Sequence, residues 1–161
     1  MNALLIGIIV LAVIVVIALA ATNPMMKKRE DDAIAVVKEK LGKDNIKVIE
    51  PRTTAMGTDP EEGGGVRGMS CLAVSDTELM AVTWSGLKQW SIPRSSIVAV
   101  DSAADDPAAV QKGTITVAFT HEGGEATAMF RLREPVPWLI ELGYDWGPDG
   151  PPEVETYDDE D

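Results

Sequence analysis

An uninterrupted apolar stretch at the start of the chain restricts its architecture more than any other feature. Residues 3–22 contain no charge and no proline, and Leu, Ile and Val would face every direction of a helix built from them. About twenty residues at about 1.5 Å per residue make a helix about 30 Å long, which matches the hydrocarbon thickness of a bilayer. Buried helices of globular domains are usually shorter and carry polar positions. The stretch therefore predicts a transmembrane helix over residues 1–23.

The residues that flank this stretch predict the orientation of the chain. Lys27, Lys28 and Arg29 follow it directly, whereas no Lys or Arg precedes it. Because basic residues stay on the cytoplasmic side, we expect a single-pass protein of the cell membrane whose main domain faces the cytoplasm. The three basic side chains would contact the membrane surface, or would act only as a stop-transfer cluster. A cleaved secretory signal is the alternative, and the absence of a basic n-region and the long apolar core disfavour it.

Two segments are expected between the apolar stretch and the main domain. Apolar residues at helical spacing predict a juxtamembrane helix over residues 24–43, with Gly42 at its end. Residues 44–65 predict a flexible linker that begins with a possible short strand, because Pro51 ends the strand and Gly, Thr and acidic residues follow. Gly63–Gly65 belong to this linker, since the GK[ST] ending of a phosphate-binding loop is missing.

From residue 66 onward the pattern changes to strands and tight turns. Apolar residues alternate with polar ones over residues 114–120 and again over residues 126–132, on the two sides of Gly123-Gly124. Such alternation across a glycine turn predicts a β-hairpin with one buried face. Six strands of this kind predict an antiparallel meander over residues 66–144, curled into a barrel or a pair of sheets.

A short helix and an acidic tail are expected after the strands. Residues 135–142 have an apolar helical face, and Trp138 on it is the candidate plug for the open end of the barrel. Residues 145–161 contain eight acidic residues and no basic one, together with Pro and Gly, which predicts a disordered tail. Tyr157 within the tail is a candidate residue for binding a basic partner surface.

The order of these motifs resembles that of the bacterial pleckstrin-homology-like domains, which are relatives of the PH and GRAM domains. The matching segments are VRGMSCLAVSDTELMAV (66–82), QWSIPRSSIVAV (89–100), GTITVAFTHEGGEATAMFRL (113–132) and PVPWLIELG (135–143). The resemblance spans roughly half of the chain and implies a partly open, seven-stranded barrel that a C-terminal helix caps, working as a binding or scaffolding module. Phosphoinositide-binding relatives carry Lys and Arg in the first turn, whereas residues 75–78 are acidic here. The expected ligand is therefore a protein.

Few side chains have the chemistry for catalysis or for metal binding. His121, the only histidine, lies at a hairpin turn, and Cys71, the only cysteine, falls in an expected strand. No catalytic residue, metal or cofactor is therefore predicted. A formal net charge of -12 without a basic stripe disfavours nucleic acid as a partner. Trp84 and Trp90 flank a turn and are candidate partner-binding residues, with packing across the two strands as the alternative.

These features together predict a fold that is mainly β with flanking helices: a transmembrane helix followed by a PH-like antiparallel β-barrel. The expected function is that of a non-catalytic interaction or scaffolding module with a protein partner at the membrane. Two other functions stay open, a membrane-anchored enzyme that uses carboxylates and a structural anchor that assembles through its transmembrane helix. Ala3 and Gly7 form one small-xxx-small step that would favour such a homo-oligomer.

Overall fold

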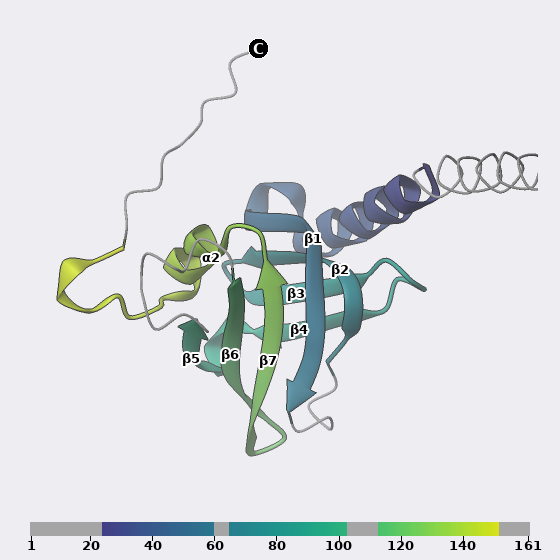
Figure 1. The fold of residues 1–161 in the computed structure, drawn as a ribbon. Helices are drawn as coiled ribbons and strands as arrows, with labels where there is room; N and C mark the ends of the chain where they lie inside the picture. Colours follow the sequence, from purple (N-terminus) through teal and green to yellow (C-terminus); the bar gives the residue numbers. More distant parts are fainter. Residues whose placement is uncertain (1–23, 60–64, 103–112, 152–161) are drawn as a thin grey trace, which may run out of the picture.

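The computed structural model describes residues 24–59, 65–102 and 113–151. Within these residues, seven strands form one antiparallel sheet with the order β4-β3-β2-β1-β7-β6-β5 (Figure 1). The strands are β1 (Ile46–Asp59), β2 (Arg67–Ser75), β3 (Glu78–Thr83), β4 (Gln89–Pro93), β5 (Ile97–Ser102), β6 (Gly113–His121) and β7 (Gly124–Leu132). Three short 3-10 turns are η1 (Lys43–Asn45), η3 (Arg94–Ser96) and η5 (Gly147–Asp149).

The inner face of the sheet holds the main hydrophobic core. The two ends of the sheet fold toward each other, so that Trp90 of β4 contacts Phe119 of β6 and Phe130 of β7, with ring centroids 5.7 and 6.3 Å apart. Such offset and edge-to-face contacts add to the apolar area that the rings bury. The predicted hairpin is confirmed, because β6 and β7 pair over their whole length and bury every second side chain.

The C-terminal helix α2 (Pro135–Leu142) closes one end of this core. Proline in its first turn suits a helix start, and Gly143 in the left-handed conformation ends it. Trp138 is buried in the main core, as expected for the plug. Tyr144 and Trp146 also pack against this core with their rings 4.9 Å apart, so the first residues of the expected acidic tail are folded.

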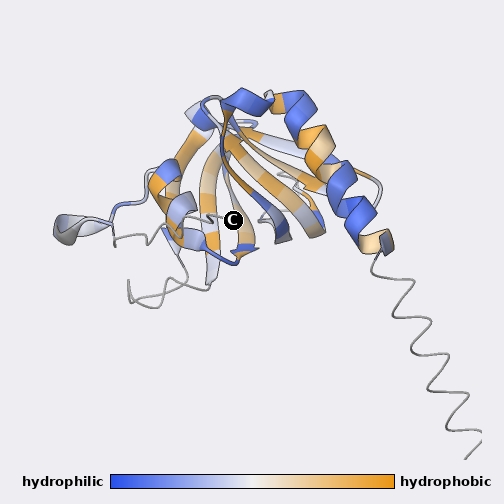
Figure 2. Cartoon of the chain, turned by 90° about the horizontal axis from the view of Figure 1, so that it is seen from above, coloured by the Kyte–Doolittle hydropathy of each residue, from blue (hydrophilic) through white to orange (hydrophobic). Residues whose placement is uncertain are grey.

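A second, smaller core lies on the outer face of β2 and β3, under the helix over residues 24–41. This helix buries Ala33, Val37 and Leu41 against the sheet and exposes its charged residues, and Figure 2 shows both hydrophilic and hydrophobic residues along it. Their spacing of four residues places the three side chains on one face of a helix. The helix predicted for residues 24–43 is therefore present, and Gly42 with φ +78 ends it.

The segment predicted as a flexible linker is largely the long strand β1, which lies at the centre of the sheet. Its pattern does not alternate, because the register with the neighbouring strands shifts three times: between Ile46 and Val48, between Glu50 and Thr53, and between Ala55 and Gly57. A bulge adds a residue to one strand and reverses the sides to which later residues point. Pro51 lies inside the second irregularity, where a missing N–H is tolerated. This strand supplies the seventh member of the sheet.

The expected barrel is wrong, because the sheet remains open. Within the described residues, the edge strands β4 and β5 each pair with one neighbour only and do not pair with each other. The turn η3 connects them at a corner, and β4 is only five residues long and ends at Pro93. A short strand with a terminal proline cannot continue the hydrogen-bond ladder that closure requires.

The membrane part of the expected architecture is also corrected. Among the residues that the structure describes, no helix has both the length and the apolar composition needed to cross a membrane. The helix over residues 24–41 is amphipathic and packs on the sheet. The segment predicted to span the membrane, residues 1–23, lies outside the described residues. The transmembrane helix in the predicted fold class and the single-pass location in the cell membrane therefore have no support in the structure.

Candidate functional site

The two tryptophans expected to form one binding patch lie on opposite faces of the sheet. The Trp84 side chain is buried under the helix over residues 24–41, and its Nε1 donates a hydrogen bond to the carbonyl oxygen of Pro51 at 3.1 Å. The Trp90 side chain is half-buried and packs against the main core on the inner face. They therefore form neither a shared exposed patch nor a cross-strand pair.

The other expected contact residues lie at the two ends of the chain. Lys27, Lys28 and Arg29 are exposed in the first turns of the described helix, and the structure provides no test of what they contact. Tyr157 lies outside the described residues.

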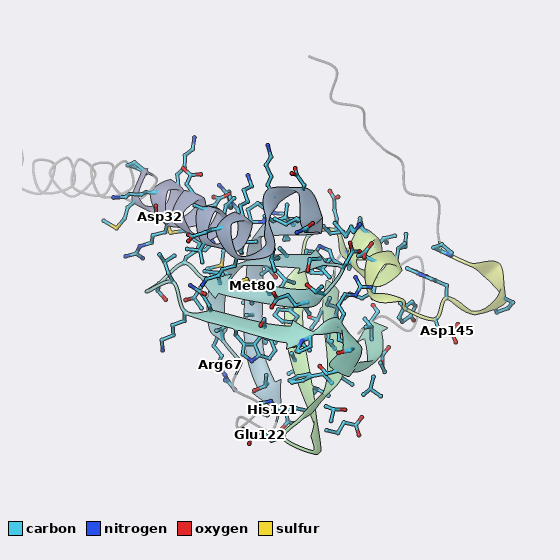
Figure 3. All side chains as sticks on the ribbon, turned by 180° about the vertical axis from the view of Figure 1, so that it is seen from behind. Asp32, Arg67, Met80, His121, Glu122 and Asp145 are labelled. Carbon is cyan, nitrogen blue, oxygen red and sulfur yellow. The ribbon has the colours of Figure 1, made fainter. Side chains whose placement is uncertain are left out.

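Cys71 and His121 have the environments expected from the sequence. The Cys71 side chain is fully buried in the second core, and burial raises the pKa of its thiol to about 12. A thiol in that state is not a nucleophile. His121 is exposed at the tip of the β6–β7 hairpin, with its Nε2 3.8 Å from Oε1 of Glu122. Figure 3 shows His121 and Glu122 at the tip of the hairpin, and Met80 beneath the helix over residues 24–41.

No described helix covers the outer face of β7 and of the second half of β1, because the helix over residues 24–41 packs only on the first half of β1, at Ile46 and Ile49. This face is turned toward the viewer in Figure 1. Directly opposite residues of an antiparallel pair share a face, so Thr54 of β1 lies beside Met69 of β2 and Arg131 of β7. Met56 is on the same face, and Met129 lies opposite Gly57. We call this surface the methionine face; its residues are Thr54, Met56, Arg67, Met69, Thr116, Met129 and Arg131.

The methionine face combines exposed apolar side chains with arginines. Met56 and Met69 are 41% and 40% exposed, and the hydroxyl of Thr54 lies 3.8 Å from the Met69 sulfur. The Arg67 side chain lies across the backbone of Gly57, where a Cβ atom would be only 2.5 Å from Arg67 Nε. Gly57 has φ +99, a conformation that L side chains rarely adopt and that favours glycine here. The bulge in β1 thus places a guanidinium beside the exposed methionines.

A charge cluster joins the helix over residues 24–41 to β1. Arg52 binds Glu30 of the helix through both its Nε, at 2.9 Å, and its Nη2, at 2.8 Å. This contact raises the pKa of the Arg52 guanidinium. Glu50 is half-buried nearby, and burial raises the pKa of its carboxyl although the Arg52 N–H and Arg133 oppose this shift. The cluster is explained by docking of the helix and contains no partner for catalysis.

A second ion pair holds α2 to the corner of the sheet. Arg94 in η3 donates from Nη1 to Oε1 of Glu141 at 2.7 Å and to the carbonyl oxygen of Ser75 at 3.3 Å. Its Nη2 donates to the carbonyl oxygen of Glu141. One guanidinium thus connects the ends of β2 and α2 with the turn between β4 and β5. No sequence pattern predicted that Arg94 contacts Glu141 and Ser75.

Comparison with known proteins assigns no family to this chain: no protein-family model matches it, and no curated protein does either. Within the described residues, no group of three or more His, Cys, Asp or Glu side chains could hold a metal ion. The methionine face is the candidate functional site because exposed methionines lie beside arginines on it. A sequence signal for it exists, since Met129 and Arg131 occupy the outward positions of a cleanly alternating strand.

Proposed function

We propose that the chain is a non-catalytic interaction module that binds a protein partner at the methionine face. The main observation in support is that Met56 and Met69 are exposed beside arginine side chains, on a sheet face that no described helix covers. Methionine side chains are flexible and polarizable, so they adapt to partner surfaces of varied shape. Exposed apolar side chains that gather on one face are typical of protein interaction sites.

The partner proposed for this face carries apolar side chains flanked by carboxylates. Arg67 and Arg131 are the charged residues beside the methionines, and the exposed Asp59 and Asp101 border the same face, opposite Thr127 and Thr116. An arginine presents a rigid fork of donors that matches a carboxylate. The surrounding negative charge would weaken the attraction of other acidic surfaces, which gives the face local selectivity.

The resemblance to bacterial PH-like domains is kept as a proposal about this same module. Seven antiparallel strands followed by a helix with a buried tryptophan support it, because the resemblance implies both. A fold does not determine a function, so the binding role depends on the methionine face itself.

The test starts from the full chain with a photo-crosslinking amino acid at position 56, or at position 140 as the control. Ile140 is 45% exposed on α2, which makes it a matched apolar position on another element. A partner crosslinked from position 56 and not from position 140 is then purified, and its affinity is measured for the wild type and for Met56→Glu, Arg131→Glu and Ile140→Glu. We expect the first two substitutions to weaken binding about tenfold or more and the third to leave it unchanged. Equal effects at all three positions would contradict the proposal.

A further inference from the structure

The helix over residues 24–41 is held on the sheet by side-chain contacts. Within the described residues, no backbone hydrogen bond joins it to a strand. Its buried side chains are those of Ala33, Val37 and Leu41, and Ile34 and Val36 pack partly buried beside them. The only ion pair that anchors it among these residues is Glu30 with Arg52, and the Arg52 side chain is half exposed. An element with so few buried contacts opens at a lower free energy than the sheet beneath it.

The surface beneath this helix is apolar and belongs to β2 and β3, whose other face packs in the main core. We call it the covered strip; it consists of Cys71, Ala73, Met80, Val82 and Trp84. The intervening residues of β2 and β3 face the main core, and both strands have hydrogen-bonded neighbours on each side. Departure of the helix would therefore expose the covered strip while the sheet keeps its pairing and its main core.

We propose that the helix over residues 24–41 is a displaceable cover and that the covered strip binds an amphipathic helix of a partner in its place. The seated helix defines the chemistry of that partner. Apolar side chains at positions i, i+4 and i+8, with a small one first, match Ala33, Val37 and Leu41. A carboxylate three residues earlier, in the place of Glu30, reaches Arg52. This is the helix-in-groove mode of recognition, at a surface distinct from the methionine face.

The single cysteine of the chain makes the opening measurable. Cys71 is fully buried in the covered strip, and it is the only thiol in the sequence. A thiol reagent added to the full-length native chain therefore reports the fraction of time that the cover is open. Global unfolding would also expose Cys71, so the experiment needs a pair of variants that separate the two routes.

Val37→Ala and Val117→Ala form that pair. Both valines are fully buried and lose the same atoms, but Val37 lies in the cover and Val117 lies in β6 within the main core. We expect Val37→Ala to speed the labelling of Cys71 about tenfold and Val117→Ala to change it by less than about twofold, although both lower global stability. Equal acceleration by the two variants would show that Cys71 reacts through global unfolding and would overturn the proposal.

A second measurement tests binding with a defined probe. A fluorescent peptide of residues 24–42 competes with the chain's own helix, and its apparent affinity scales with the open fraction. We expect it to bind the Val37→Ala chain about tenfold more tightly than the wild type or Val117→Ala, and a peptide carrying Val37→Asp not to bind. Labelling that accelerates without this gain in peptide affinity, or binding of the Asp peptide, would also overturn the proposal.

Discussion

Replacement of Arg94 by methionine tests whether one guanidinium joins the corner of the sheet to α2. Its Nη1 lies 2.7 Å from the Glu141 carboxylate and 3.3 Å from the Ser75 carbonyl oxygen, and the Arg94 and Glu141 side chains are 26% and 29% exposed. A hydrogen bond to a charged group contributes about 1.5–3 kcal/mol when buried, and solvent reduces this contribution here. Methionine retains the packing of the aliphatic stem. We therefore expect the free energy of unfolding to fall by about 2–3 kcal/mol, which lowers Tm by about 6–12 °C.

The assay is urea unfolding of the full chain, followed by tryptophan fluorescence and by far-UV circular dichroism. A double-mutant cycle with Glu141→Gln isolates the ion pair, and we expect a coupling energy of about 1–2 kcal/mol. Lys47→Met is the control, because it breaks the Lys47–Asp76 pair, whose side chains are 43% and 70% exposed, and should change stability by less than about 0.5 kcal/mol. An effect of Arg94→Met no larger than that of Lys47→Met, or a coupling near zero, would refute the reasoning.

Three further substitutions have defined outcomes. Burial raises the pKa of Glu50, so the folded state binds its proton more tightly than the unfolded chain; wild type should therefore gain stability relative to Glu50→Gln as the pH falls from about 7 to about 4, measured by urea unfolding at each pH. Trp84→Phe removes the indole hydrogen bond and leaves a gap under the helix, which should cost about 1.5–3 kcal/mol in the same assay. Gly57→Ala should cost about 1–3 kcal/mol, because φ is +99 and the Arg67 side chain blocks the added methyl group; the control Gly113→Ala, where nothing lies within 4 Å of the added atom, should be tolerated.

The elements with regular apolar spacing could be predicted from the sequence. The hairpin of β6 and β7, the helix that ends at Gly42 and the helix that carries Trp138 were all expected, with bounds close to those observed. In each of them the hydrophobic period matches the local geometry, and a glycine marks the end. Local structure is readable where propensity, pattern and turn residues agree.

The long central strand could not be read in the same way. β1 contains Pro51 and Gly57, and its second half has four threonines or acids. Three shifts of register break its alternation. Some of its polar side chains bond to residues far away along the chain. The hydroxyl of the buried Thr53, for example, donates to the carbonyl oxygen of Arg131 at 2.9 Å, a residue 78 positions away. The residues next to Thr53 in the sequence do not indicate so distant a hydrogen-bond partner. The segment was therefore predicted as a linker.

The relative placement of the two tryptophans could not be predicted for a related reason. Trp84 and Trp90 are close in sequence, and proximity suggested one patch. The side to which each points depends on strand parity and on the turn between them, where Leu87 has φ +49. Trp84 follows Met80 and Val82 in steps of two, which places it on the outer face under the helix. The face on which each tryptophan lies could be predicted by counting residues in steps of two along the strand, and not from their distance along the chain.

The same parity argument explains where the methionine face lies. β2 and β3 have apolar residues on both faces, so a second layer must cover their outer side, and the helix over residues 24–41 does so. β6 and β7 alternate cleanly, with threonines, Met129 and Arg131 outward, so their outer side requires no cover. Among the described residues, the helix on the outer face therefore packs on the half of the sheet that would otherwise expose apolar side chains. The position of the open face follows from where the alternation of the strands is cleanest.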